Sequence, residues 1–456
     1  MKNNTNKKPE PDYPKIHYWE FYPADLWNEY RQSVDEGLDI EKYQTLFDEI
    51  AKLPNGKIKK EFGDVIFELI SAAETRPDYK YKEPSDLEEI KALRQPYSFK
   101  GTLDKNRLES KIAGAWFGRI YGCMLGKSIE GIKSPELERL LKQSSNYPMH
   151  RYILKSDIDR LDLKKFKFDL KNRPYADIID GMPADDDTNY TFLAQRIIEK
   201  HGRDFTPENI PEEWIASQPK SAYCTAERVA FCNFLNGYQP PFSAFHKNPY
   251  REWIGAQIRT DYYGYINPGD PEAAAETAWR DATVSHTKNG IYGAMFAAAM
   301  LATAAVTQNT YDIIMSGISQ IPASSRLYEN VLSVVDGYKN GVSKADCFAE
   351  IHKKFDENTE YGWCHTIPNA MIVAASLLYG NGDYGKSICM AVETAFDTDC
   401  NAATVGSVLG MANGIESIPM CWREPIGDKL HTSCFGAETV SINELIQKTL
   451  LHIEKN

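Results

Sequence analysis

Two short acidic motifs are the parts of this 456-residue sequence whose residue types could do chemistry. The first is the run Asp185–Asp187, and the second is the pair Asp397 and Asp399, with Cys400 directly after it. Carboxylates are preferred protein ligands of hard divalent cations. Adjacent carboxylates repel one another, and a bound cation would offset that repulsion through its own charge. Together the two motifs predict a metal site.

Each acidic motif also stands where a helix is expected to begin, which offers a second interpretation. Asp side chains at a helix N-terminus accept hydrogen bonds from the free backbone N–H groups. The run at 185–187 precedes Tyr190, Phe192 and Leu193, whose spacing is helical. It therefore stands where the chain enters the core. Capping requires one carboxylate and not three, so metal binding is the favoured interpretation of the two motifs.

Small residues recur at every fourth position in the two segments expected to form the core around these motifs. The recurring glycines are Gly406, Gly410 and Gly414 after the second motif, and Gly114, Gly118, Gly122 and Gly126 within Arg107–Gly126. This spacing places them on one helical face, so that another helix can approach closely. Gly inside a helix costs about 1 kcal/mol relative to Ala. The two stripes therefore predict a tightly packed pair of helices.

Three other polar residues stand near predicted helix ends. Glu130 lies in the loop after the first glycine stripe, where a solvated glutamate is the alternative to a functional one. His286 lies at the start of an Ala-rich helix, and Asn369 opens a buried one. A lone histidine in such a place is more often a hydrogen-bonded core residue than a catalytic one. We keep His286 and Asn369 as candidate substrate contacts.

The long segment Asn236–Pro271 is rich in aromatic residues, Gly and Pro and has no regular period. Long irregular loops in a compact fold are uncommon and often functional. Within it, Arg259 is a candidate anion clamp, Asp261 is a further candidate substrate contact, and the tyrosines could stack on a sugar or a base. A self-packed surface loop is the alternative interpretation.

Composition and charge exclude several classes of partner. The formal net charge is −12 and the isoelectric point is near 5.4, which argues against nucleic acid or an anionic membrane. No apolar run approaches the roughly 20 residues of a membrane span, and residues 1–16 lack the apolar region of a signal peptide. Nine scattered cysteines without a CxxC spacing are typical of a reducing compartment. We expect a cytoplasmic protein.

The chain divides into two predicted parts. Residues 1–97 are expected to form a helical extension with a disordered start at 1–14 and helices at 24–36, 39–53, 57–75 and 86–94. This part shows no residues for chemistry, and its expected role is a helical cap or interface. Residues 98–456 lack strong β alternation, so we predict an all-α catalytic domain in a layered bundle.

Four motifs give the sequence a family resemblance. They are, in this order, GAWFGRIYGCMLGKSIEG, ADDDTNYTFL, DATVSHTKNGIYGAMFAAA and AFDTDCNAATVGSVLGMANG. Between Lys111 and Trp422 the chain thereby resembles the ADP-ribosylglycohydrolase family, of the dinitrogenase-reductase-activating glycohydrolase type. The resemblance implies an all-α fold with a binuclear magnesium centre, manganese being possible. It also implies hydrolysis of the bond between the ribose anomeric carbon and a protein side chain or small molecule.

The resemblance also implies roles for individual residues. Asp186 and Asp187 match the paired aspartates of the first metal motif. Asp397 and Asp399 match those of the second, and Glu130 matches the glutamate of a mobile loop. Two positions depart from the family.

Asp185 and Cys400 stand where the family usually has Thr or Ser. The additional carboxylate favours metal but repels a diphosphate, and a thiol is a poor magnesium ligand.

The expected activity is therefore a metal-dependent glycohydrolase that cleaves an N- or O-glycosidic bond, most plainly in an ADP-ribosyl conjugate. Its transition state carries positive charge on the ribose, which nearby carboxylates stabilise. Two metals would orient the ribose hydroxyls and activate a water, with Glu130 or Asp187 as general acid or base. The alternatives are a hydrolase of a smaller riboside or other glycoside and a non-catalytic metal-binding relative.

Overall fold

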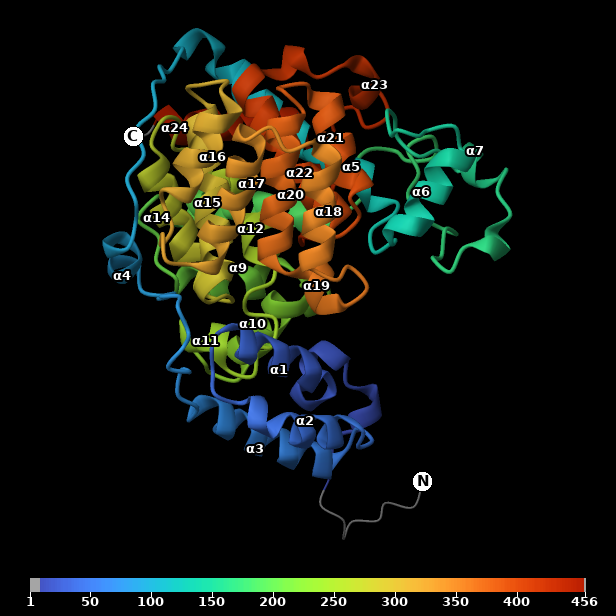
Figure 1. Cartoon of the computed structure of the whole chain (residues 1–456). Helices are drawn as coiled ribbons and strands as arrows, with labels where there is room; N and C mark the ends of the chain where they lie inside the picture. The colour runs from blue at the N-terminus through green and yellow to red at the C-terminus, as the bar shows by residue number, and fades with distance from the viewer. Residues whose placement is uncertain (1–8, 455–456) are drawn as a thin grey trace.

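A pair of helices in direct backbone contact forms the centre of the computed structural model, which describes residues 9–454. They are α5 (Leu108–Lys127) and α22 (Thr398–Asn413), drawn close together in Figure 1. A Cβ on Gly118 would overlap the backbone oxygen of Gly406, and one on Gly410 would overlap that of Gly114. Only glycine allows the backbones to come this close, so the predicted pairing of the two stripes is confirmed.

The other helices of the body surround this pair. They are α8 (Asp186–His201), α9 (Asn209–Ser217), α10 (Thr225–Leu235), α11 (Phe242–Phe245), α12 (Gly255–Arg259), α13 (Asp261–Tyr265), α14 (Pro271–Ala282), α15 (Lys288–Ala304), α16 (Thr310–Ile318), α17 (Arg326–Lys339), α18 (Lys344–Lys354), α19 (Glu360–Cys364), α20 (Thr366–Tyr379), α21 (Tyr384–Glu393) and α23 (Met420–Arg423). Helix α15 is buried over almost its whole length, since its many alanines let neighbours pack on every side.

The chain ends with a small sheet and a helix. Strands β1 (Lys429–His431) and β2 (Thr439–Ser441) pair in antiparallel register, with Leu430 opposite Val440. Helix α24 (Ile442–Glu454) follows and packs on α5. The structure is mostly helical, which confirms the predicted fold class. Within residues 9–454, no helix has the length and apolar character needed to span a membrane.

The prediction of one long irregular loop at 236–271 is wrong. Three short helices, α11, α12 and α13, interrupt this segment, and the residues of α12 and α13 are buried. Each helix is too short to show a helical period in the sequence. Most of the aromatic residues that indicated a loop instead fill the interior of the protein, whereas Tyr238, Phe242 and Phe245 are exposed.

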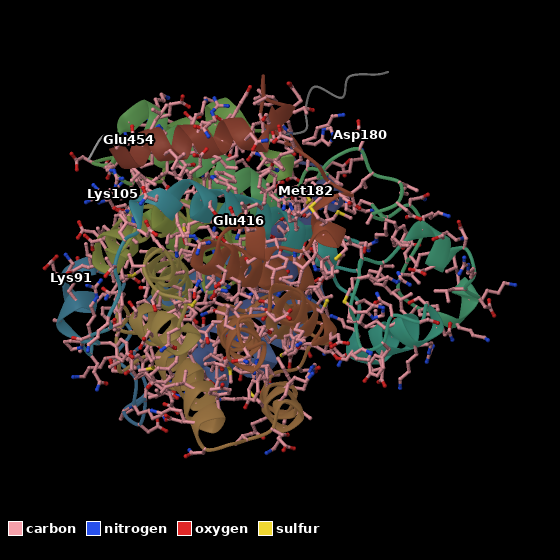
Figure 2. The ribbon with its side chains drawn as sticks, turned by 90° about the horizontal axis from the view of Figure 1, so that it is seen from above. Lys91, Lys105, Asp180, Met182, Glu416 and Glu454 are labelled. Atoms are coloured by element: carbon pink, nitrogen blue, oxygen red, sulfur yellow. The ribbon has the colours of Figure 1, made fainter. Side chains whose placement is uncertain are left out.

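The segment 132–180 forms a lobe at the side of the body, with α6 (Ser134–Gln143) and α7 (Lys155–Ile158) as its helices. Figure 2 shows this lobe from above and its return to the body near Asp180 and Met182. Residues 163–165 of the lobe form a 3-10 turn.

The N-terminal extension packs below the body in Figure 1, and its chain then rises along one side to reach α5. Its helices are α1 (Leu26–Asp35), α2 (Gln44–Ala51), α3 (Lys57–Ser71) and α4 (Leu87–Ala92), preceded by the short 3-10 helices η2 (Tyr18–Glu20) and η3 (Tyr22–Asp25). The four predicted helices are present, and each is shorter than predicted. Of the start predicted to be disordered, residues 1–8 lie outside the described residues.

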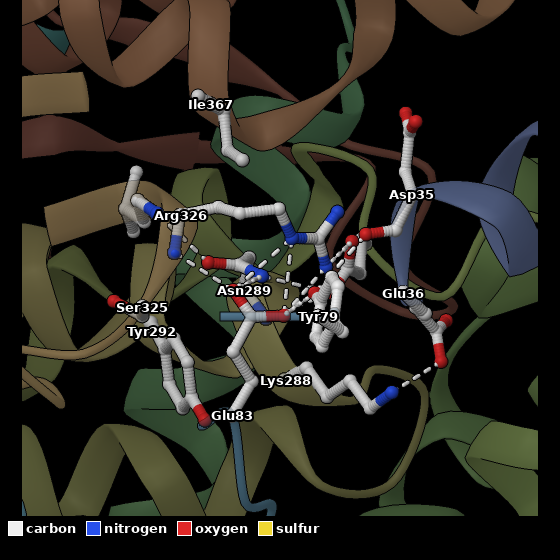
Figure 3. A network of polar contacts seen from close by, with 12 residues as sticks. Asp35, Glu36, Tyr79, Glu83, Lys288, Asn289, Tyr292, Ser325, Arg326 and Ile367 are labelled. Carbon is white, nitrogen blue, oxygen red and sulfur yellow. Dashed lines mark hydrogen bonds and ion pairs between the residues drawn. The ribbon is translucent and has the colours of Figure 1, made fainter. Parts of the chain in front are cut away.

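Buried ion pairs join the extension to the body. Arg251 of the body pairs with Glu29 at 2.7 Å and with Glu36 at 2.6 Å, both on or next to α1. Figure 3 shows the same interface around Arg326, which pairs with Glu83 at 2.8 Å, and Lys288, which pairs with Glu36 at 2.6 Å. Removing one partner of a buried pair leaves an uncompensated charge. The extension is therefore fixed to the body at defined points.

Candidate metal centre

The two acidic motifs begin two helices whose N-termini meet beside the end of α5. Asp185 caps α8, because its carboxylate accepts a hydrogen bond from the backbone N–H of Asp187 at 2.9 Å. Asp397 occupies the same position before α22, yet its side chain makes no capping hydrogen bond. A Cβ on Gly126 would overlap the backbone of Thr398 and Asp399, so the glycine stripe brings the start of α22 against α5. Helix capping thus accounts for one carboxylate of the cluster.

The carboxylates from the two motifs converge. One ligand atom from each of Cys123, Asp185, Asp187 and Asp399 lies within 4.8 Å of the others. A second such group contains Asp397, Asp399 and Cys400, so Asp399 belongs to both groups. All of these side chains are buried. Residues far apart in the sequence therefore form one acidic cluster that could hold metal.

Two of the buried carboxylate oxygens lack partners, which tests whether the residues fit a cation. Asp397 and Asp399 are 4% and 1% exposed. In each, Oδ1 has no hydrogen-bond partner among the residues that the structure describes. Burial raises the pKa of both groups well above its usual range, and the charges of Glu130 and Asp185 add to the effect. An unpaired buried carboxylate is costly, and a hard divalent cation is the ligand that such oxygens fit.

Two cations from α5 neutralise part of the first motif. Lys127 pairs with Asp185. Burial alone would raise the pKa of Asp185, but the Lys127 ammonium outweighs it and lowers that pKa. Arg119, which is fully buried, pairs with both Asp187 and Asp261 at 2.8 Å. The second motif has no such ion pair in the described part of the chain, so the uncompensated charge concentrates at the start of α22.

Glu130 and Asp186 face a pocket beside the cluster, which has a volume of about 110 Å³ and is also lined by Asp397 and Cys400. The charge of Asp399 and burial raise the pKa of Glu130 well above its usual range. Burial and the charge of Asp185 raise the pKa of Asp186 to about 6. A carboxyl group that retains its proton near neutral pH can act as a general acid.

The rest of the pocket is aromatic and acidic. Its other lining residues are Tyr18, Trp19, Cys224, Thr225, Glu227, Trp253, Ile254, Gly255, Ile258, Glu360, Trp363 and Cys364. No Lys, Arg or His is among the described residues that line it. Two of the aromatic residues, Tyr18 and Trp19, come from the N-terminal extension. No sequence pattern places the extension at the site, because these two side chains belong to no motif.

Arg259 and Asp261 lie in the interior, and neither lines the pocket. Arg259 pairs with Glu227 at 2.5 Å and also with Asp281, while Asp261 pairs with Arg119. Each arginine thus serves two carboxylates, since Arg119 also pairs with Asp187, and Asp261 Oδ1 has no hydrogen-bond partner among the described residues. A role for either residue in substrate binding stays a prediction.

His286 and Asn369 are also buried and do not line the pocket. His286 Nδ1 lies 2.8 Å from the hydroxyl of Ser285, and burial with nearby Arg259 lowers its pKa well below the usual range. Asn369 accepts a hydrogen bond from the backbone N–H of Asp397 at 3.3 Å and one from Asn401 at 2.7 Å. Asn369 therefore fixes the backbone of the second acidic motif.

Three residues at the cluster were not predicted from the sequence to belong to the site: Arg119, Cys123 and Lys127. They follow one another at every fourth position of α5, directly beside the glycine stripe at 118, 122 and 126. A charged residue on a helix face that must be buried needs a partner of opposite charge. The spacing of four residues, next to the buried glycine stripe, therefore indicates that these side chains lie near acidic partners.

Comparison with known proteins gives one family match. A family model described as ADP-ribosylglycohydrolase matches residues 104–453. No curated protein matches the chain. A solved structure titled "ADP-ribosylglycohydrolase-related protein complex" is similar over 76% of this chain and 99% of its own, with 14% sequence identity and a TM-score of 0.41. The family match begins after the N-terminal extension.

Proposed function

The chain belongs to the ADP-ribosylglycohydrolase family, and from this premise we propose a metal-dependent glycohydrolase that cleaves an N- or O-glycosidic bond at the ribose anomeric carbon. The first candidate substrate is an ADP-ribosyl conjugate. The observation that carries this proposal is the convergence of Asp185, Asp187 and Asp399, with unpaired buried oxygens on Asp397 and Asp399. In a purely structural protein, the repulsion between these carboxylates would only reduce stability.

The aspartates of the two motifs would hold Mg²⁺ or Mn²⁺, because hard carboxylate oxygens are what these ions prefer. Such ions would neutralise the cluster and lower the pKa of a water that serves as the nucleophile. Cys400 donates a hydrogen bond from Sγ to Asp187 at 3.2 Å, and burial raises the pKa of its thiol. We therefore assign Cys400 to orienting Asp187 as a neutral thiol.

Glu130 is the favoured proton donor to the leaving group. It faces the pocket and has a raised pKa, so it can carry the proton that the departing nitrogen or oxygen needs. Asp187, the other candidate, is buried and already paired with Arg119. The charges of Asp186 and Asp397 would then stabilise the positive ribose in the transition state.

The test is a hydrolysis screen with ADP-ribosylated peptides and simple ribosides, in the presence of Mg²⁺ or Mn²⁺. We expect the wild type to release a product with a free anomeric hydroxyl, and we expect both EDTA and Asp397→Ala to abolish the release. Failure of the wild type on every ribosyl conjugate would contradict the proposal. Equal activity of wild type and Asp397→Ala would also contradict it.

One observation favours a smaller riboside as the second candidate substrate. A diphosphate is usually bound by Arg or Lys, and no basic residue is among the described residues that line the pocket. Calorimetry with ADP-ribose separates the two substrates. Binding in the presence of metal supports the ADP-ribosyl conjugate, and its absence supports the riboside.

A further inference from the structure

Tyr18 and Trp19 form a wall of the pocket that contains Glu130, Asp186 and Asp397. Both belong to η2, in the part of the chain before the family match. We propose that these two side chains contact the leaving group of the substrate and determine which leaving group is accepted. The proposal rests on the proposed function, since it assumes that this pocket is where the bond is cleaved.

Trp19 is held firmly on α10. The guanidinium of Arg228 lies 4.8 Å from the centre of the Trp19 ring. Arg228 also donates to the backbone oxygen of Tyr223 at 2.7 Å, which fixes its own position. The next residue, Glu20, pairs with Lys220 at 2.6 Å. The indole therefore has one orientation relative to the pocket.

Tyr18 lies at the mouth of the pocket and is 42% exposed. Burial of its hydroxyl, together with the charges of Glu360 and Asp25, raises its pKa to about 12. The phenol therefore stays neutral. The ring stacks on that of His17, with the ring centroids 4.8 Å apart, and keeps an exposed surface for a ligand. A large aromatic side chain that is exposed beside a pocket is typical of a binding surface.

The rest of the extension keeps η2 in place. Asp25 accepts a hydrogen bond from the hydroxyl of Tyr250 at 2.6 Å. The buried pairs between Arg251 and the two glutamates Glu29 and Glu36 follow directly along the chain. Tyr18 and Trp19 are thus held at the site. The extension, expected to be a cap or an interface, would serve to contact the leaving group.

The lining of the pocket indicates the chemical class of the leaving group. Trp253 and Trp363 join Tyr18 and Trp19, and carboxylates such as Glu360 supply the remaining charge. Aromatic faces bind flat rings and cations, whereas carboxylates repel anions. The volume of about 110 Å³ is well below that of pockets for drug-sized ligands. The geometry points to a single flat ring that is neutral or positively charged.

An unpaired donor supports the same class. Trp253 is buried and lines the pocket, and its Nε1 has no hydrogen-bond partner among the described residues. A buried indole N–H usually has an acceptor. The N–H is enclosed by the protein, so a heterocycle with a carbonyl oxygen would provide that acceptor if the indole turned toward a ring lying against Tyr18 and Trp19.

The experiment compares two ribosides with Mg²⁺ present: nicotinamide riboside, whose flat ring is cationic while attached and leaves as neutral nicotinamide, and methyl riboside, whose leaving group has no ring. For Tyr18→Ala and Trp19→Leu we expect KM for nicotinamide riboside to rise about tenfold, the size of one aromatic contact, with KM for methyl riboside unchanged. Trp27→Leu is the matched control, because Trp27 is an exposed aromatic residue of the extension that does not line this pocket. Tyr18 and Trp19 variants that behave like this control would overturn the proposal.

A binding measurement separates failure of the wall from failure of the proposed function. Nicotinamide is titrated into the Mg²⁺-loaded proteins by calorimetry, which requires no turnover. Weaker binding to Tyr18→Ala than to wild type supports the wall even where no riboside is hydrolysed. Equal affinity of wild type, Tyr18→Ala and Trp19→Leu, or no binding to the wild type, contradicts it. Tyr18 is partly exposed, so its truncation leaves a folded protein should Trp19→Leu fail to fold.

Discussion

The two walls of the pocket are built in different ways. The acidic wall comes from two short motifs at the starts of α8 and α22, next to a helix pair whose backbones touch. The aromatic wall comes from single residues of separate segments, and two of them belong to the extension. The residues proposed for chemistry therefore lie beside two helices in backbone contact. Two of the residues proposed for selectivity, Tyr18 and Trp19, lie instead on the extension, which buried ion pairs attach to the body.

The largest expected effect comes from disturbing the rigid wall. In Gly410→Val, the new side chain must displace the backbone of Gly114, so we expect a loss of more than about 4 kcal/mol in the free energy of unfolding. Gly337→Ala in α17 is the control, because the nearest atom to its Cβ would lie at 3.7 Å and helix propensity favours Ala. Urea denaturation measures both. Equal stability of Gly410→Val and wild type would show that the helix pair is not rigid.

Asp399→Asn should separate chemistry from stability within the acidic wall. We expect activity on a ribosyl conjugate to fall about 10³-fold, while the metal-free protein becomes more stable, because a buried acidic group with an unpartnered oxygen is removed. Asp336→Asn on the exposed side of α17 is the control. Turnover assays and thermal melts in EDTA measure the two effects. Wild-type activity, or a lower melting temperature, would contradict this assignment.

Arg251→Met should loosen the attachment of the aromatic wall. It leaves Glu29 buried without its cationic partner and leaves Glu36 with Lys288 alone, and we expect a loss of about 3 kcal/mol. Metal affinity should stay unchanged, since Arg251 lies outside the acidic cluster. The control is Arg160→Met, at an exposed position of the side lobe. If Arg251→Met changed the free energy of Mg²⁺ binding as much as the free energy of unfolding, the two walls would not be independent.

The smallest expected effect is a pH dependence of the free energy of unfolding, caused by a lysine at the far end of the helix pair. Lys111 of α5 donates to the backbone oxygen of Ala412 at 2.9 Å, and burial with nearby Arg107 lowers its pKa to about 8. The unfolded chain then binds more protons than the folded one between about pH 8 and 10. Stability should therefore rise with pH in this window relative to Lys111→Met. Urea denaturation of the wild type and of Lys111→Met at both ends of this window measures the free energy of unfolding. An equal change with pH in the two proteins would contradict the assignment.

The sequence could predict the acidic wall because the residues within each of its two motifs are adjacent or nearly so in the chain. Two aspartate motifs and two stripes of glycine at a spacing of four were enough to predict the helix pair and the convergence that the structure shows. The aromatic wall carries no such pattern. Tyr18, Trp19, Trp253 and Trp363 come from distant segments, and no periodicity connects them.

Burial also hid the roles of several charged residues. Arg259 looked like an anion clamp because it lies among Gly, Pro and aromatic residues, a composition typical of surface loops. In the structure it is enclosed between Glu227 and Asp281. Such pairings depend on tertiary contacts, which a local pattern does not contain.

The central claim is that carboxylates from 185–187 and from 397–399 converge around divalent cations. Anomalous diffraction from a crystal soaked in Mn²⁺ tests it most directly. We predict anomalous peaks within about 2.2 Å of carboxylate oxygens from both motifs, lost in Asp399→Asn. A wild-type crystal at saturating Mn²⁺ with no peak between the starts of α8 and α22 would contradict the account.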